Sequence, residues 1–200
     1  MEKYILSAIL GYLIGNIASS YFIGKKMKNI DIRKHGSGNA GATNTFRVLG
    51  LKAGALVFIA DIVKGALATA IGLWITGDRG GAMLTGVLAV VGHDWPVFLN
   101  FKGGKGIATS FGLMLVLFPE TALILFLVAV PLMILTSYVS VGSVGAAVLF
   151  PILLVLFQQP QNIVIMGIVV SMLAIIRHKD NLVRLWQGNE NKFSFKKQGR

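Results

Sequence analysis

The chain has 200 residues, of which 54% are hydrophobic, and its mean hydropathy is +0.72. This composition is too apolar for an ordinary soluble domain, and the long apolar runs predict an all-α integral membrane protein with one helical bundle. The net charge is +11, but only 14% of the residues are charged, which excludes a nucleic-acid binder with a basic surface. The absence of cysteine excludes disulfides, thiolate metal sites and a cysteine nucleophile.

Seven apolar stretches are predicted to cross the membrane. In chain order they are residues 4–23, 53–76, 81–92, 107–118, 121–135, 141–157 and 162–176. Residues 107–135 are divided into two short spans because one helix of that length would measure about 43 Å, against a bilayer core of about 30 Å. Such a helix would also place Pro119 near mid-membrane, where it breaks the hydrogen-bond ladder.

The distribution of basic residues favours seven spans over six. With seven, residues 25–52, the loop with Lys102 and Lys105, and the tail from residue 177 lie on one side. All but three of the 19 lysines and arginines are then on that side. The positive-inside rule makes this side cytoplasmic, so we expect the N-terminus outside and the C-terminus inside.

The first polar segment, residues 34–50, is predicted to become helical after Ser37, with Ser37 as its N-cap and Gly50 as its end. Asn39, Thr43 and Arg47 then fall four residues apart on one stripe, with Asn44 beside them. The small residues, among them Gly38 and Gly41, allow a ligand to approach the backbone. Free amides at a helix start together with an arginine suit a phosphate. The alternative is an interfacial amphipathic helix that meets lipid headgroups.

The second polar segment, residues 92–110, contains a glycine-rich turn around Lys105. Gly103, Gly104 and the lysine resemble part of a phosphate loop, but the full nucleotide-binding pattern is missing, so a nucleotide site is rejected. An anion cradle is predicted instead, because glycines expose backbone amides and a helix follows at Ile107. For His93, a structural hydrogen bond near the membrane surface is the alternative to a role in binding.

The third polar segment, residues 177–192, is predicted to continue the last span as a helix. Arg177, Asn181 and Arg184 would share one face, with His178 at its edge. Basic neighbours are expected to lower the pKa of His178 and favour its neutral form. A basic amphipathic helix end without a binding role is the alternative.

Two further features carry polar groups into or beside the bundle. Asp61 and Lys64 lie three residues apart within one span, where each is the expected partner of the other. Whether this pair is structural or functional is left open. Ser140 and Ser143 lie in a cytoplasmic turn and either donate to a bound oxyanion or cap the helix that follows.

Together the three polar segments resemble the motifs of the bacterial acyl-phosphate-dependent glycerol-3-phosphate acyltransferases. The matching residues run from Ser37 to Arg47, from Gly92 to Gly106, and from His178 through Asn181 and Arg184 to Glu190. The likeness covers the order and spacing of the motifs along one domain, residues 1–200.

The resemblance implies transfer of a fatty acyl group from acyl phosphate to the 1-hydroxyl of glycerol 3-phosphate, without a cofactor. It implies a multi-pass protein of the bacterial inner membrane that contacts membrane lipids and has its site on the cytoplasmic side. The catalytic residues would be Ser37, Asn39, Lys105 and His178, and no metal ligands are predicted. The substrate-binding residues would be Gly38, Gly41, Thr43, Asn44, Arg47, His93, Gly103, Gly104, Ser143, Asn181, Arg184 and Glu190. The proton acceptor, either His178 or a substrate phosphate oxygen, is left open.

Two other classes remain as alternatives. A transporter of phosphorylated or anionic small molecules would need polar residues on both faces of the bilayer and a site at its midplane. A scaffold that binds anionic lipids would explain the positive charge but not the positions of asparagine, threonine and histidine.

Overall fold

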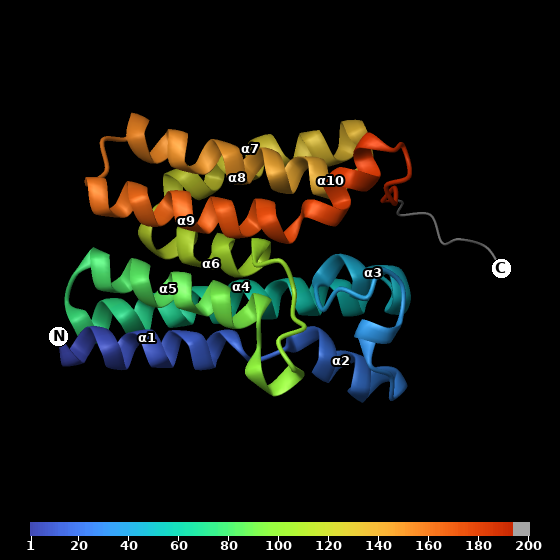
Figure 1. Ribbon diagram of the computed structural model, residues 1–200, viewed down its shortest axis with the longest axis horizontal. Coiled ribbons are helices and arrows are strands. Elements are labelled where there is room, and N and C mark those ends of the chain that lie inside the picture. Colours follow the sequence, from blue (N-terminus) through green and yellow to red (C-terminus); the bar gives the residue numbers. More distant parts are fainter. Residues whose placement is uncertain (194–200) are drawn as a thin grey trace.

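The protein is a bundle of roughly parallel and antiparallel helices, described here for residues 1–193 in a computed structural model (Figure 1). The helices are α1 (Glu2–Gly15), α2 (Ser19–Lys28), α3 (Ala42–Leu49), α4 (Leu51–Thr76), α5 (Arg79–Asp94), α6 (Ile107–Leu117), α7 (Pro119–Thr136), α8 (Val139–Leu156), α9 (Gln161–Arg177) and α10 (Lys179–Trp186). Two 3-10 turns, η1 (Ile32–Lys34) and η2 (Val97–Leu99), lie in connecting loops. The described residues contain no strand.

Five helical segments in residues 1–193 are long and apolar enough to cross a membrane: Glu2–Lys28, Leu51–Thr76, Arg79–Leu99, Pro119–Thr136 and Val139–Leu156. The pair α9 and α10 makes a sixth if the two helices, bent by 55°, form one span. The apolar helix α6 has 11 residues, about 16 Å of helix, and is short for a full crossing. The membrane class is therefore confirmed, while the count of seven spans stays a prediction.

Pro119 determines where one of the predicted breaks between helices lies. The expected division within residues 107–135 is present, because α6 ends at Leu117 and α7 begins at Pro119. Proline has no backbone N–H to donate and is tolerated in the first turn of a helix, so the new helix starts there. In the first apolar stretch, the expected single helix is instead broken between α1 and α2, at residues 16–18.

Small residues bring the helices of the lower half of Figure 1 into close contact. Gly11 and Gly15 of α1 lie against the backbone of α5 at Thr85 and Ala89, so the four-residue spacing of these two glycines allows close packing of the two helices. Gly65 of α4 packs in the same way against Thr109 of α6. A side chain at these positions would overlap backbone atoms of the neighbouring helix.

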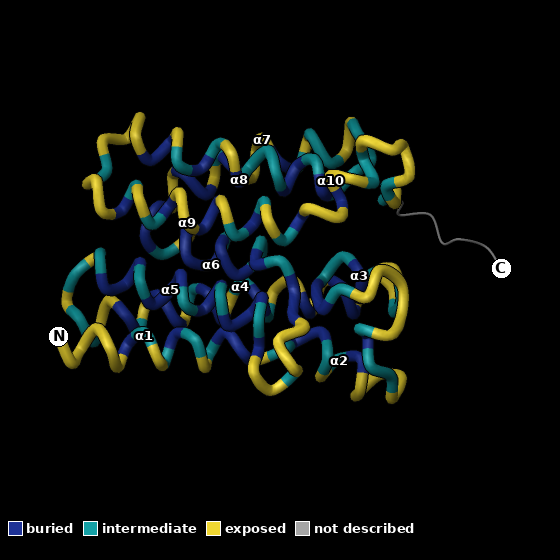
Figure 2. Tube along the Cα trace, viewed as in Figure 1, coloured by how far each residue is buried: buried dark blue, intermediate teal, exposed yellow. Residues whose placement is uncertain are grey.

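The apolar core lies between α5, α6, α7, α8 and α9. Its buried members include Met83, Leu113, Phe118, Phe150 and Leu154. The outer faces of the bundle are apolar as well and remain exposed, as Figure 2 shows for α1 and α7. Apolar residues on both the inside and the outside are typical of a bundle whose solvent is lipid.

Candidate active site

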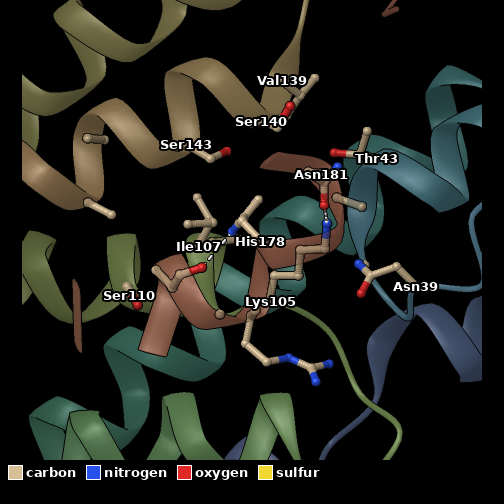
Figure 3. A pocket seen from close by; sticks show the side chains of 18 of the residues that line it. Asn39, Thr43, Lys105, Ile107, Ser110, Val139, Ser140, Ser143, His178 and Asn181 are labelled. Atoms are coloured by element: carbon tan, nitrogen blue, oxygen red, sulfur yellow. Dashed lines mark hydrogen bonds between the residues drawn. The ribbon is translucent and has the colours of Figure 1, made fainter. Parts of the chain in front are cut away.

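A cavity of about 590 Å³ opens at the end of the bundle where α3 and α10 lie, and its inner part runs between α6, α7, α8 and α9 (Figures 1 and 3). All three polar segments line it. Seven cationic side chains and three carboxylates face the cavity, so its polar part favours anions. The cations are Arg33, Arg47, Lys102, Lys105, Arg177, Lys179 and Arg184, and the acids are Asp61, Asp180 and Glu190.

The first polar segment forms a loop where a helix start was expected. Gly36 and Gly38 have φ of 61° and 73°, which interrupts the helix, and α3 begins only at Ala42 with Gly41 before it. Ser37 is therefore not an N-cap, and Asn39 is not helical. The expected end of the helix at Gly50 is confirmed.

The Asn44 side chain holds this loop in shape. Its amide donates to the carbonyls of His35 (3.0 Å), Asn39 (3.0 Å) and Ile32 (3.2 Å). Its oxygen accepts from the backbone N–H of Ser37 at 2.8 Å. Because backbone groups already occupy both ends of this buried amide, Asn44 positions Ser37 and its neighbours.

Thr43 and Arg47 lie one turn apart on α3 and both line the cavity. Figure 3 places Thr43 and Asn39 on the side of the cavity formed by the first polar segment. Arg47 is exposed, and its side chain forms no hydrogen bond or ion pair with any of residues 1–193. Its guanidinium is available to an anion in the cavity.

The second polar segment folds back on the end of α5 and is joined to the other two. Its Gly103 and Gly104 amides donate to the carbonyls of Asp94 (3.2 Å) and His93 (3.0 Å). The carbonyl of Gly103 accepts from the amide of Ala40 at 3.4 Å, which links the loop to the first segment. The expectation that the glycines expose their backbone amides to an anion is therefore wrong for Gly103 and Gly104, because both amides are already bonded to carbonyls of α5.

Arg177 connects the same loop to the third polar segment. Its guanidinium donates to the Gly104 carbonyl at 2.6 and 2.9 Å and to that of Gly103 at 3.4 Å, and it stacks 5.2 Å above the Trp95 ring. Sequence reasoning placed Arg177 with Asn181 on one helix face and missed this function. The signal that was available is the position of the arginine at the end of a span, where its long side chain can reach a neighbouring loop.

Lys105 lies in the loop just before α6, outside the spanning segments. Its ammonium donates to Asn181 Oδ1, the dashed line between these residues in Figure 3. The pKa of Lys105 is lowered to about 8, mainly by burial; Glu190 opposes the shift, and Arg184 and Arg177 add to it. A cation held in a partly dry site interacts more strongly with an anion than one in water does.

The third polar segment is not a continuous helix. The chain bends by 55° at His178, between α9 and α10. Because of this bend, the two arginines have different partners. Arg177 donates to the loop that contains Gly103 and Gly104, called the glycine loop below, while Arg184 forms an ion pair with Glu190 at 2.8 Å. The same carboxylate accepts from Asn181 at 2.6 Å and from Ser140 at 3.3 Å, so Glu190 joins α10 to the start of α8.

His178 lies buried at the bend and beside the cavity. Its Nδ1 is 2.7 Å from the carbonyl of Ala174, which can only accept, so the neutral ring carries its proton on Nδ1 and a lone pair on Nε2. Burial first, and then Lys105, lower the pKa of His178 to about 4. The predicted direction is confirmed, but the main cause is loss of solvent.

The remaining candidates also reach the cavity. Ser140 and Ser143 lie in the first turns of α8, and neither caps it, because Tyr138 holds the N-cap position without a side-chain bond. His93 lies buried beside Gly104. The expected pair of Asp61 and Lys64 is confirmed by an ion pair of 3.0 Å.

The fold and the cavity define an integral membrane protein with a predominantly cationic cavity at one end of its helices. A family model described as glycerol-3-phosphate acyltransferase matches residues 5–188. The glycerol-3-phosphate acyltransferase of Thermoanaerobacter sp. (strain X514) is 47% identical over 192 residues, 96% of each chain.

Two solved structures have the same fold. The crystal structure of PlsY, an integral membrane glycerol 3-phosphate acyltransferase, in its glycerol 3-phosphate form is similar with a TM-score of 0.90 at 40% identity. Its lysophosphatidic acid form gives 0.88 at 39%, and both comparisons cover 96% of each chain. The chain belongs to the glycerol-3-phosphate acyltransferase family.

Proposed function

We propose that the protein transfers a fatty acyl group from acyl phosphate to the 1-hydroxyl of glycerol 3-phosphate, releasing lysophosphatidic acid and phosphate. Full-length similarity to glycerol-3-phosphate acyltransferases supports the reaction class over a transporter. The observation that carries the proposal is the meeting of all three polar segments around one cationic cavity.

The cavity has two parts that match the two halves of a lipid-like donor. Its mouth is lined by lysines and arginines, and its inner part by apolar side chains of α6, α7, α8 and α9, including Met114, Phe126 and Phe150. An acyl chain entering from the bundle and a soluble dianion entering from the mouth would meet between them. Its volume is within the range of ordinary ligand sites.

Acyl phosphate is a mixed anhydride and is already activated, so the enzyme needs no nucleophile of its own. The oxygen of the glycerol 3-phosphate hydroxyl attacks the acyl carbon, the bond from that carbon to the phosphate oxygen breaks, and phosphate leaves with the electron pair. Holding two anions together against their repulsion, in the correct orientation, is the main task of the protein.

Lys105, Arg47 and Thr43 are proposed to bind phosphate oxygens, and Arg184 with Asn181 to shape the second anion pocket. Ser37 and Asn39 orient the reacting hydroxyl and carbonyl. The remaining proposed contacts lie around these groups. Gly38 and Gly41 let the substrates approach the backbone, and His93 and Ser143 donate hydrogen bonds. Gly103, Gly104, Glu190 and Asn44 hold the other groups in place and do not themselves bind the substrates.

The hydroxyl proton is proposed to go to a phosphate oxygen of the substrate. A histidine with a pKa of about 4 is a poorer base than a phosphate monoester, whose second pKa is about 6. His178 then acts through Nε2 as a hydrogen-bond acceptor that aligns the hydroxyl.

In the membrane, the proposed arrangement is one domain of seven spans, residues 1–200, of which residues 194–200 lie outside the described part of the structure. The N-terminus is outside, and the polar segments 34–50, 92–110 and 177–192 face the cytoplasm of a bacterial cell across its inner membrane. The concentration of basic residues at the end of the bundle with α2, α3 and α10 supports this orientation (Figure 1).

Purified protein incubated with palmitoyl phosphate and glycerol 3-phosphate tests the reaction. Lysophosphatidic acid and inorganic phosphate are expected in equal amounts, with no product from palmitoyl-CoA. Uptake of glycerol 3-phosphate into proteoliposomes without acyl transfer would favour the transporter.

A further inference from the structure

A cluster of polar groups lies inside the bundle, behind the glycine loop. Lys64 of α4 is almost fully buried, and its Nζ lies 2.8 Å from the Ile17 carbonyl, 2.8 Å from His93 Nδ1 and 3.0 Å from Asp61 Oδ1. Ser19 donates to the same Asp61 oxygen at 3.0 Å. The cluster therefore joins α4, α5 and the break between α1 and α2.

The partners of Lys64 determine where His93 carries its proton. An ammonium has three hydrogens, and a backbone carbonyl and a carboxylate can only accept them. Two hydrogens are directed to Ile17 and Asp61, and the third to His93 Nδ1, which must then supply a lone pair. The ring is neutral and holds its one proton on Nε2.

The other ring nitrogen of His93, Nε2, lies against Gly104 and close to the cavity. His93 lines the cavity, and no group in residues 1–193 is within hydrogen-bond distance of Nε2 as an acceptor. Gly104 packs directly against this edge of the ring, because an added Cβ at this position would overlap Nε2. Glycine therefore leaves room for the imidazole next to the loop proposed to bind phosphate.

We propose that Asp61 and Lys64 are positioning residues that hold His93 in the Nε2–H tautomer, so that His93 donates a hydrogen bond to a phosphate oxygen of a bound substrate. This deepens the proposed function and rests on it. Asp61 holds the Lys64 ammonium in place, and Lys64 in turn sets the tautomer of the His93 ring. The ring then provides a neutral hydrogen-bond donor beside the cationic side chains of the cavity. Lys64 does not line the cavity, and the Asp61 oxygen that belongs to the cluster is engaged by Lys64 and Ser19.

A purely structural cluster would behave differently. If the pair only closes the break between α1 and α2, its loss lowers stability and leaves substrate affinity unchanged. If the pair positions His93, its loss instead weakens substrate binding, because the Nε2 of His93 is then no longer always protonated.

The tautomer is measured directly by ¹⁵N NMR of histidine-labelled protein in detergent, with the His93 signal assigned by its loss in His93→Gln. We expect a protonated Nε2 and an unprotonated Nδ1 in the wild-type protein. In the charge-neutral double variant Asp61→Asn with Lys64→Met, we expect a mixture of tautomers. A wild-type His93 protonated at Nδ1 would overturn the proposal, whether or not the protein transfers acyl groups.

Steady-state kinetics supply the second readout. His93→Asn and the double variant are expected to raise KM for glycerol 3-phosphate or for palmitoyl phosphate by about 10- to 100-fold, the range for a hydrogen bond to a charged group. His93→Gln, whose amide nitrogen can occupy the place of Nε2, should stay within about 5-fold of wild type.

Lys52→Met, which removes an exposed lysine from the same helix, is the matched control and should leave both KM values unchanged. The substrate whose KM rises identifies the phosphate that His93 contacts. KM values within 3-fold of wild type in both His93→Asn and the double variant would overturn the proposal. An inactive wild-type protein would contradict the proposed function, while the NMR result would still stand.

Discussion

The ammonium of Lys105 donates a hydrogen bond to the side-chain oxygen of Asn181, joining the glycine loop before α6 to helix α10. These residues are 76 positions apart in the chain. The bond holds the lysine at the cavity, which all three polar segments line.

Replacing Lys105 by methionine is expected to lower kcat/KM for glycerol 3-phosphate by about 10²- to 10³-fold. The reason is that the variant loses a preorganised positive charge in a partly buried site. Initial rates over a range of both substrates measure the loss. A change of less than 3-fold would show that this lysine does not bind the reacting groups.

The pH dependence of the reaction should report the same ammonium. Its pKa of about 8 means that the charged form is present below pH 8 and is lost as the pH rises through that value. We expect kcat/KM to fall above about pH 8, and to stay level there in Lys105→Arg, because arginine keeps its charge. An alkaline limb that persists unchanged in this variant would assign the titration to another group.

His178 distinguishes the two routes for the proton. Replacement by alanine is expected to lower kcat by about 10-fold, the loss of an orienting hydrogen bond, without moving the acid side of the pH profile. A general base would contribute about 10²- to 10⁴-fold. A loss in that upper range, accompanied by a shift of the acid limb, would make the histidine the proton acceptor.

Glu190 should matter for stability as well as activity. Its carboxylate joins Asn181, Arg184 and Ser140, and its side chain is only 6% exposed. Glu190→Gln is expected to cost about 1–2 kcal/mol, at the low end for a buried ion pair because Arg184 is a third exposed. Thermal inactivation in detergent measures this, with Glu2→Gln as the exposed control, and equal half-lives for the two variants would contradict it.

Close packing of α1 on α5 gives a further prediction. Gly15→Val places a side chain against the Ala89 carbonyl and should sharply reduce the yield of folded protein. Gly145→Ala, whose new methyl would meet only the end of the Leu132 side chain, is the control. Equal yields from size-exclusion chromatography would show that these helices can separate without cost.

The sequence predicted those features that depend on local pattern. Apolar runs located the helices within a few residues, Pro119 marked the start of α7, and the spacing of Asp61 and Lys64 identified an ion pair. The residue types alone also identified polar groups that line the cavity, because glycine, asparagine and basic residues interrupt an otherwise apolar sequence.

Features that depend on distant partners could not be predicted in the same way. Two hydrogen bonds hold the break after α1: the side-chain oxygen of Asn16 accepts from the Val97 amide, and Lys64 donates to the Ile17 carbonyl. Neither contact can be inferred from the local sequence. The bend at His178 and the late start of α3 likewise reflect tertiary contacts. At the bend, Arg177 donates to the Gly104 carbonyl, and before α3 the Asn44 side chain accepts from the Ser37 amide.

Convergence of the three polar segments on one face of the membrane is tested most directly by single-cysteine labelling, since the natural chain has no cysteine. Exposed positions 35, 102 and 189 represent the three segments, and positions 3 and 161 the opposite end. In oriented proteoliposomes, a membrane-impermeant maleimide should label the first three from the same side, more slowly when glycerol 3-phosphate is present, and the last two only from the other side. Labelling of any of the first three from the opposite side would contradict a shared site.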